Sequence, residues 1–257
     1  MEKDGVYYSY GWKKGRYYSM YEMTRQITYS QVGSNLKTDI GMITHFLQDC
    51  ALFHSESIGK GVDSLDGTKK AWFLSGWQIE VLRYPEYKEN ITVQTWPHDF
   101  KGLYGYRNFD ILDSEGSRIV QANSIWIFMD LENMHPVKAT EQDKEGYDIE
   151  PALPMEYAPR KIKIFDEECR DNRTIEPVLV KRSFIDSNRH VNNVRYVTEA
   201  LDYVEDVESI RSIRVDYRKA AVLGDMLYPV LYNKDAVRQI VFEDGDGQPY
   251  VIVEVMV

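Results

Sequence analysis

Residues 186–190 carry the side chains best suited to chemistry, with a carboxylate, a carboxamide and an imidazole at alternate positions: Asp186, Asn188 and His190. In an extended segment alternate side chains share one face, so we expect these three to point into one site. A carboxylate or an imidazole can activate a water molecule, and a carboxamide can orient that water or hold a carbonyl. Each residue type is also common in loops and helix caps, so the prediction depends on their spacing.

A helix is predicted directly after this segment. Apolar residues recur at helical spacing at Val194, Val197, Leu201 and Val204. We therefore expect a helix over about 193–207, with Asn192 and Asn193 supplying the capping chemistry at its start. A helix start offers unpaired backbone N–H groups and the positive end of the helix dipole. These groups suit a carbonyl oxygen that becomes an oxyanion during a reaction.

The first half of the chain predicts one long helix followed by strands. The helix opens at Thr38-Asp39, includes His54 on its apolar stripe, and ends at Gly59 and Gly61. Strand patterns follow at residues 71–82, 91–96, 105–112 and 119–131. The last two flank a turn at 113–116 and predict a hairpin.

The second half repeats this order. After its helix, strand patterns occur at residues 209–217, 226–232, 236–242 and 250–257. The last two flank residues 244–247, Asp-Gly-Asp-Gly, which again predict a hairpin. A helix followed by strands without intervening helices favours an α+β unit, in which the helix packs on a curved antiparallel sheet.

Two such units define the expected domains. We expect an N-terminal domain over 1–135, a proline-rich and charged connector over 136–173, and a C-terminal domain over 174–257. Only the second unit has an Asp-x-Asn-x-His segment before its helix. A duplicated fold that keeps its chemistry in one copy would have this pattern.

Composition excludes several classes of protein. The hydrophobic content of 43% and charged content of 28% are those of a globular protein, and no run of 18 apolar residues predicts a membrane span. The net charge of −10 argues against nucleic-acid binding. Residues 1–7 lack the pattern of a secretory signal or a transit peptide. With two cysteines a disulfide framework is not expected, and we expect a cytoplasmic protein.

Neither cysteine suits covalent catalysis. Cys50 falls within the first helix pattern, where we expect a packed core thiol. Cys169 lies among acidic residues, which disfavour a reactive thiolate. His54 is expected to be a core histidine. No cluster of ligand residues has metal-binding spacing and no glycine-rich phosphate loop occurs, so we expect no metal and no cofactor.

The segment Asp186-Ser-Asn-Arg-His190-Val-Asn-Asn-Val-Arg-Tyr196 resembles the active-site segment of the acyl-acyl-carrier-protein thioesterases, the plant plastid enzymes and their bacterial relatives. Further resemblance runs along most of the chain, at residues 50–54, 77–85, 92–96 and 122–129. The motif around His190 is specific, and the other stretches support it.

The resemblance implies a tandem double hot-dog fold, in which each half is a long helix wrapped by a curved antiparallel sheet. It implies hydrolysis of the thioester between a fatty acyl chain and the phosphopantetheine arm of acyl carrier protein. The N-terminal domain would house the acyl chain and the C-terminal domain the chemistry. Asp186, Asn188 and His190 would carry over as the catalytic residues, with Asn192 and Asn193 at the helix start.

One departure concerns the stretch Tyr217-Arg-Lys-Ala220-Ala221, where the plant enzymes have a Glu-Cys pair. Both residues are alanine here, so the family's glutamate has no counterpart at this place. We therefore expect Asp186 or His190 to act as the base on a bound water. Two alternatives stay open: a hot-dog thioesterase for acyl-coenzyme A, and an acyl-binding sensor without turnover.

Carrier proteins of this kind are acidic, so an acidic chain needs a local basic patch to bind one. Arg189 and Arg195 lie closest to the predicted site and are the first candidates. The tandem repeat could satisfy its pairing surface within one chain, so a homodimer is left as an alternative.

Overall fold

The computed structural model describes residues 11–13, 16–18, 20–61 and 69–257. Residues 1–7, considered above for targeting signals, lie outside the described part. The chain divides into two compact units. The first comprises Met1–Leu74 and Val81–Tyr157, and the second comprises Ser75–Glu80 and Ala158–Val257. The predicted connector is therefore shared, since its residues up to 157 belong to the first unit and the rest to the second.

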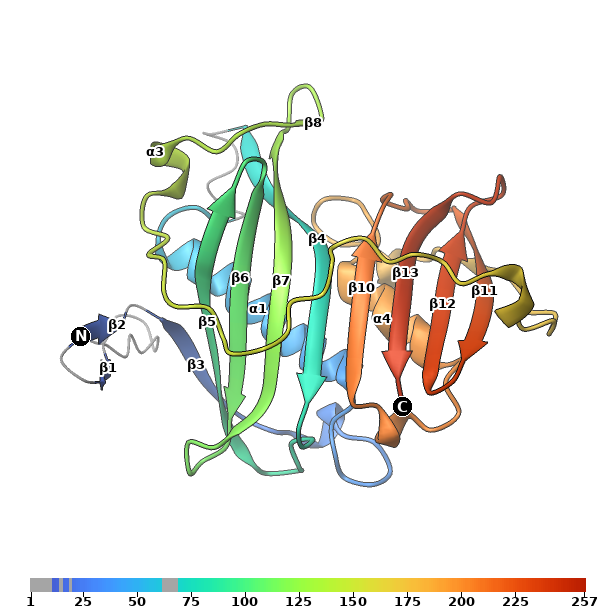
Figure 1. Ribbon diagram of the computed structural model, residues 1–257, viewed down its shortest axis with the longest axis horizontal. Helices are drawn as coiled ribbons and strands as arrows, with labels where there is room; N and C mark the ends of the chain where they lie inside the picture. Colours follow the sequence, from blue (N-terminus) through green and yellow to red (C-terminus); the bar gives the residue numbers. More distant parts are fainter. Residues whose placement is uncertain (1–10, 14–15, 19, 62–68) are drawn as a thin grey trace. The chain divides into compact units, whose positions relative to one another are not determined.

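The first unit contains one long helix and an antiparallel sheet. Its elements are β1 (Gly11–Lys13), β2 (Arg16–Tyr18), β3 (Tyr21–Gln26), the 3-10 helix η1 (Tyr29–Gln31), α1 (Ile40–Ser57), part of β4 (Lys70–Val81), β5 (Asn90–Lys101), β6 (Tyr104–Leu112), β7 (Arg118–Asp130), β8 (His135–Pro136) and the short helix α3 (Glu141–Lys144). Strands β3, β5, β6 and β7 pair in that order, and α1 runs behind them in Figure 1.

Local chemistry sets both ends of α1, as the sequence predicts. The Asp39 side chain caps the start by accepting the Met42 backbone N–H at 2.7 Å. Gly59, with φ of 71°, takes the left-handed conformation that ends the helix. Between these ends the face of Ile43, Phe46 and Leu47 is fully buried, so packing on the sheet stabilises the helix.

We expect Asp39→Ala to lower the free energy of unfolding by about 1 kcal/mol, because the Met42 N–H would lose its acceptor. Urea unfolding measures this change. Asp39→Asn is the matched control, since its amide oxygen can still accept the bond. Equal losses in the two variants would show that the cap is not the source of the effect.

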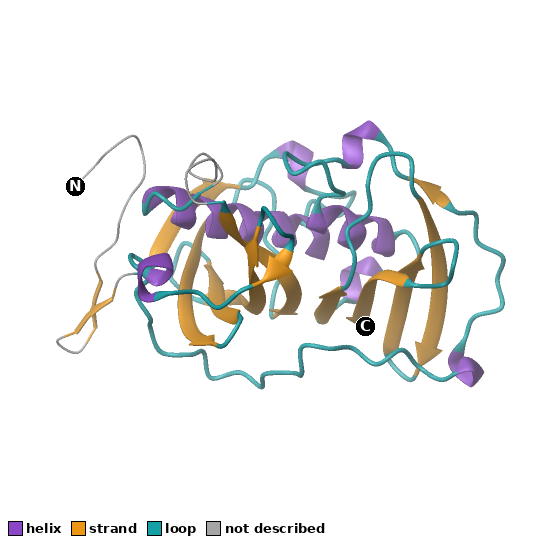
Figure 2. Ribbon diagram, turned by 90° about the horizontal axis from the view of Figure 1, so that it is seen from above, coloured by secondary structure: helices purple, strands orange, loops and turns teal. Residues whose placement is uncertain are grey.

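The second unit repeats this plan. Its elements are the 3-10 helix η3 (Glu167–Cys169), β9 (Val178–Leu179), the 3-10 helix η4 (Arg182–Phe184), α4 (Asn193–Leu201), the 3-10 helix η5 (Val207–Ser209), β10 (Ser212–Tyr217), β11 (Met226–Lys234), β12 (Val237–Glu243) and β13 (Pro249–Met256). Residues 76–80 of β4 pair with β10, and the order then continues through β13, β12, β11 and β9. Figure 2 shows α4 on one side of these strands.

Helix α4 is shorter than predicted. It ends at Leu201, whereas the apolar spacing suggested a helix to about residue 207. The Tyr203 and Val204 N–H groups bond three residues back, to Ala200 and Leu201, which tightens and closes the helix. Asp206 then caps the separate turn η5 by accepting the Ser209 N–H at 3.2 Å. An apolar residue at helical spacing, Val204, is thus buried without being helical.

Both predicted hairpins are confirmed and use the same turn chemistry. Asp113 accepts the N–H groups of the residues two and four positions later, and Asp244 does the same. Gly116 and Gly247 have φ of 81° and 75°, a conformation that favours glycine. The Asp-x-x-Gly pattern therefore fixes the register of β6 with β7 and of β12 with β13.

The outer face of the second sheet is covered by a chain segment from the predicted connector. Ile162 is buried with Tyr232, Val241 and Ile252 of the sheet. Phe242, the neighbour of Val241, contacts Tyr196 of α4 instead. Alternate residues of β12 thus face the helix and the connector segment, which explains why this strand is apolar on both faces.

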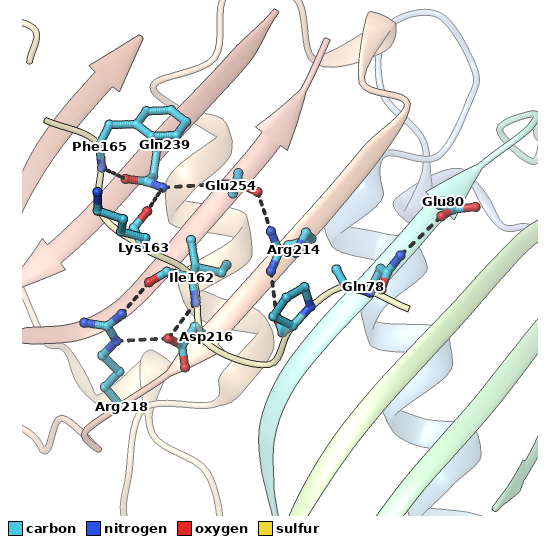
Figure 3. A network of polar contacts seen from close by, with 12 residues as sticks. Gln78, Glu80, Ile162, Lys163, Phe165, Arg214, Asp216, Arg218, Gln239 and Glu254 are labelled. Atoms are coloured by element: carbon cyan, nitrogen blue, oxygen red, sulfur yellow. Dashed lines mark hydrogen bonds and ion pairs between the residues drawn. The ribbon is translucent and has the colours of Figure 1, made fainter. Parts of the chain in front are cut away.

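Buried polar side chains anchor this segment to the sheet (Figure 3). Asp216, only 1% exposed, accepts the Ile162 N–H at 3.2 Å and the Arg218 Nε–H at 3.0 Å. Gln239, fully buried, accepts the Phe165 N–H at 3.0 Å and donates to the Lys163 carbonyl at 3.1 Å. These bonds satisfy backbone groups of a segment that has no regular secondary structure.

Among the described residues, no helix is both long enough and apolar enough to cross a membrane.

Candidate active site

Residues 186–190 form a tight turn. The Asp186 N–H donates to the His190 carbonyl at 2.8 Å, and the Arg189 N–H donates to the Asp186 carbonyl at 3.1 Å. Arg189 has φ of 62°, the left-handed region that a residue with a Cβ rarely adopts. Ile185 and Val191 pair as an antiparallel bridge at the base of the turn. Asp186 and His190 are therefore neighbours across the turn.

The expectation of an extended segment is wrong. The Asp186 carboxylate is hydrogen-bonded to the backbone of its own turn. Its Oδ1 accepts the Asn188 N–H at 2.8 Å and the His190 N–H at 3.3 Å. These local bonds compete with an extended conformation. Asn188 lies at the exposed tip, while Asp186 and His190 are half-buried. The turn brings the carboxylate-bearing and imidazole-bearing residues together by pairing rather than by alternation.

Helix α4 begins at Asn193, three residues after the turn, as predicted. Asn192 is the cap, and its Oδ1 accepts the Val194 N–H at 2.9 Å. The Asn192 N–H donates to the Phe184 carbonyl at 2.8 Å, and the Arg195 N–H donates to the Asn192 carbonyl at 2.8 Å. Among the described residues we find no acceptor for the Asn193 N–H. Backbone amides at the positive end of a helix are a kind of group that can bind an anion.

The alanine pair that departs from the plant pattern lies beside the turn. Ala220 is exposed and Ala221 is buried. The Ala221 carbonyl accepts the Val191 N–H at 2.9 Å, and its N–H donates to the Tyr196 hydroxyl at 3.2 Å. Burial raises the pKa of Tyr196 well above its usual value, with smaller contributions from nearby acidic groups that include Asp186. Sequence reasoning missed Tyr196, because a tyrosine within an amphipathic helix is typical of a core residue.

The two candidate arginines differ. Arg189 is exposed at the turn. Arg195 forms an ion pair with Glu199 at 2.6 Å, and its guanidinium lies 4.2 Å from the centre of the Phe184 ring. The charge of Arg195 is thus partly neutralised within its own helix, whereas the charged side chain of Arg189 is exposed to solvent.

The remaining predicted groups belong to the core or the surface. Cys50 is fully buried, its thiol donates to the Val93 carbonyl at 3.5 Å, and burial raises the pKa of that thiol. Cys50 is therefore the packed core thiol that the sequence predicts. Cys169 lies half-buried on the connector segment. Within the described ranges, no three side chains of His, Cys, Asp or Glu gather so as to hold a metal ion.

His54 is the core histidine that was expected, but its partner was not anticipated. The Arg107 Nη1 donates to the His54 Nδ1 at 2.7 Å, and the ring stacks on Tyr21 with centroids 5.5 Å apart. His54 is 5% exposed and Arg107 is 7% exposed. Burial and, to a lesser extent, the Arg107 charge lower the pKa of His54 to about 3. The pair joins residues 53 positions apart, which no local pattern indicates.

Solved structures share this architecture. An acyl-ACP thioesterase from Bacteroides thetaiotaomicron superimposes with a TM-score of 0.81 at 24% identity, covering 92% of this chain and 97% of that one. The 12:0-ACP thioesterase from Umbellularia californica gives a TM-score of 0.81 at 19% identity, with 92% and 96% covered. Together with the helix and antiparallel sheet in each unit, these likenesses establish a double hot-dog α+β fold.

Sequence comparison defines the family. The acyl-ACP thioesterase N-terminal domain matches residues 18–147 and the acyl-ACP thioesterase C-terminal domain matches residues 156–244. The chain belongs to the acyl-ACP thioesterase family. It is 26% identical over 215 residues to oleoyl-acyl carrier protein thioesterase 2, chloroplastic, of Arabidopsis thaliana, a match that covers 77% of this chain. The match covers 58% of that relative's length, so the chain spans less than two thirds of it.

Proposed function

We propose that this chain hydrolyses the thioester of fatty acyl-acyl carrier protein, releases the free fatty acid and so ends its synthesis. The observation that carries the proposal is the match to both domains of the family, together with the Asp186–His190 turn directly before α4 in the second of them. The names of the relatives, oleoyl- and palmitoyl-acyl carrier protein thioesterases, support a fatty acyl substrate. The N-terminal domain would house the acyl chain.

In the proposed mechanism, Asp186 or His190 takes a proton from a water molecule held with the help of Asn188. The water oxygen bonds to the thioester carbonyl carbon, and the carbonyl oxygen becomes an oxyanion. The Asn193 N–H at the helix start, where Asn192 is the cap, would stabilise that oxyanion, a contact that is typically worth about 3–4 kcal/mol. Collapse of the intermediate breaks the C–S bond, and the departing sulfur takes up the proton.

The proposed partner is an acyl carrier protein, and Arg189 is its first contact because its charge is exposed beside the turn. Arg195 would contribute less, since Glu199 already pairs with it. We propose the cytoplasm as the location because both cysteines are free thiols.

We expect Arg189→Glu to raise KM for acyl-acyl carrier protein roughly tenfold at low salt, with the difference shrinking as salt screens the charges. Steady-state hydrolysis at two ionic strengths measures this effect. Hydrolysis of a neutral acyl-pantetheine should be unaffected. Arg211→Glu, the same charge change at another exposed arginine of the second unit, is the control. An unchanged KM at low salt would remove Arg189 from the binding surface.

The substrate assignment is tested by presenting the same acyl group on acyl carrier protein and on coenzyme A. We expect the higher kcat/KM with the carrier protein, because only that substrate adds protein contacts to the acyl and pantetheine contacts. A higher kcat/KM with acyl-coenzyme A would favour the coenzyme A thioesterase instead. A series of acyl lengths on the preferred carrier then gives the chain-length profile.

A further inference from the structure

The loop that joins β10 to β11, residues 218–225, is the backbone neighbour of the proposed catalytic turn. Val222 pairs with His190 in an antiparallel bridge, and the Ala221 carbonyl accepts the Val191 N–H at 2.9 Å. The position of His190 therefore depends on the conformation of this loop. Because the loop lacks regular secondary structure on both sides of the bridge, other contacts must hold it.

Asp225 closes this loop. Its Oδ2 accepts the Val222 N–H at 3.0 Å, and its own N–H donates to the Val222 carbonyl at 3.1 Å. Gly224, with φ of 92°, provides the left-handed conformation that the tight turn needs. Both backbone groups of Val222 are thus held by a single residue, and Val222 is the residue paired with His190.

Tyr250 of β13 anchors Asp225 to the sheet. Its hydroxyl donates to the same Asp225 Oδ2 at 3.1 Å. On the other side, the Val180 N–H donates to the Asp225 carbonyl at 2.9 Å, and the Gly224 N–H donates to the Val180 carbonyl at 3.1 Å. Asp225 is therefore fixed to two separate parts of the second unit, a central strand and the segment after β9.

Tyr196 completes the frame from α4. Its hydroxyl accepts the Ala221 N–H at 3.2 Å, so the loop is tied to the helix as well as to the sheet. After burial, the acidic groups that raise the pKa of Tyr196 include both Asp225 and Asp186. The carboxylate of the loop and the carboxylate of the turn thus act on the same hydroxyl, which places Asp225 in the electrostatic neighbourhood of the proposed site.

We infer that Asp225 is a positioning residue for His190, acting through the Val222 backbone and supported by the Tyr250 hydroxyl. The inference rests on the proposed function in assigning catalysis to His190. Asp225 acts through the hydrogen bonds that its side-chain oxygen accepts. It therefore contributes to the position of His190 through the geometry of these bonds and not through its negative charge. It gives the site a fixed loop at the place where the family's glutamate is replaced by Ala220.

The test compares Asp225→Ala, Asp225→Asn and Tyr250→Phe with the wild type in acyl-thioester hydrolysis. We expect Asp225→Ala to lower kcat at least tenfold with KM little changed, because a displaced His190 affects the reaction more than binding. Asp225→Asn should restore most of kcat, since its amide oxygen still accepts the Val222 and Tyr250 bonds. Tyr250→Phe keeps the carboxylate and the ring, and should give an intermediate loss in a folded protein.

A readout that does not need turnover separates this inference from the proposed function. The chain has five histidines, so their ring signals in ¹⁵N correlation spectra can be assigned, and His190→Ala identifies that of His190. We expect the His190 signals to move in Asp225→Ala and to return in Asp225→Asn, whether or not the wild type hydrolyses acyl thioesters. Unchanged His190 signals in Asp225→Ala would overturn the inference. A kcat in Asp225→Asn as low as in Asp225→Ala would also overturn it, because charge would then be the contribution.

Discussion

Replacing His190 by alanine is expected to lower kcat for acyl-acyl carrier protein by roughly 10²–10⁴-fold, the usual contribution of a positioned acid–base group. KM should change little, because His190 would act on the water and the reacting carbonyl rather than on the carrier protein. Only the His190 N–H and carbonyl, which alanine retains, bond to Asp186. The turn should therefore persist, and the loss should be one of chemistry. Free-thiol release under saturating substrate measures the effect.

His135→Ala is the matched control, since His135 is exposed in the first unit and lies outside the proposed site. It should keep the activity of the wild type. Asp186→Asn tests the other proposed base, the Asp186 carboxylate, without removing the turn. Its amide oxygen can still accept the two backbone N–H groups that organise the turn. A His190→Ala protein that is folded and fully active would mean that the chemistry lies elsewhere in the chain.

The second large effect concerns stability in acid and arises in the first unit. His54 has a pKa lowered from 6.5 to about 3, because it is buried beside Arg107. The unfolded chain therefore binds more protons than the folded chain between these values. Stability from the neutral imidazole is fully present above pH 6.5 and is lost as the pH falls toward 3. We expect a loss of up to about 5 kcal/mol over this range from His54 alone.

Carboxylates also titrate in this range, so the contribution of His54 is taken from a comparison. His54→Gln keeps an acceptor for the Arg107 guanidinium and removes the titrating ring. The wild type should lose stability more steeply than this variant between pH 6.5 and 3, measured by urea unfolding at several pH values. Parallel stability curves for the two proteins would show that His54 is readily protonated in the folded state.

The parts of the fold that depend on local chemistry could be predicted from the sequence. Asp39 and Gly59 mark the ends of α1, and Asp113 and Asp244 mark two hairpins, because each acts on backbone groups a few residues away. The end of α4 could not be predicted in this way. Val204 continues the apolar spacing, but it is buried by tertiary packing after the helix has closed.

In the candidate site, too, some features could be predicted from the sequence and others could not. The residue types and the helix cap at Asn192 were recognisable, because the cap bonds within its own helix. The turn was not recognisable, since it depends on hydrogen bonds from nearby backbone N–H groups to the Asp186 carboxylate, which compete with an extended conformation. The frame around Asp225 and Tyr250 was also missed, because it joins residues that are distant in the sequence.

The most direct test of the central claim is the reaction of wild-type protein with a fatty acyl-acyl carrier protein, following free thiol and free fatty acid together. We expect the two products to appear in equal amounts over many turnovers, as water attack on the thioester requires. Tight binding of the acyl-carrier protein with neither product formed would contradict this expectation, and would mark the chain as an acyl-binding sensor.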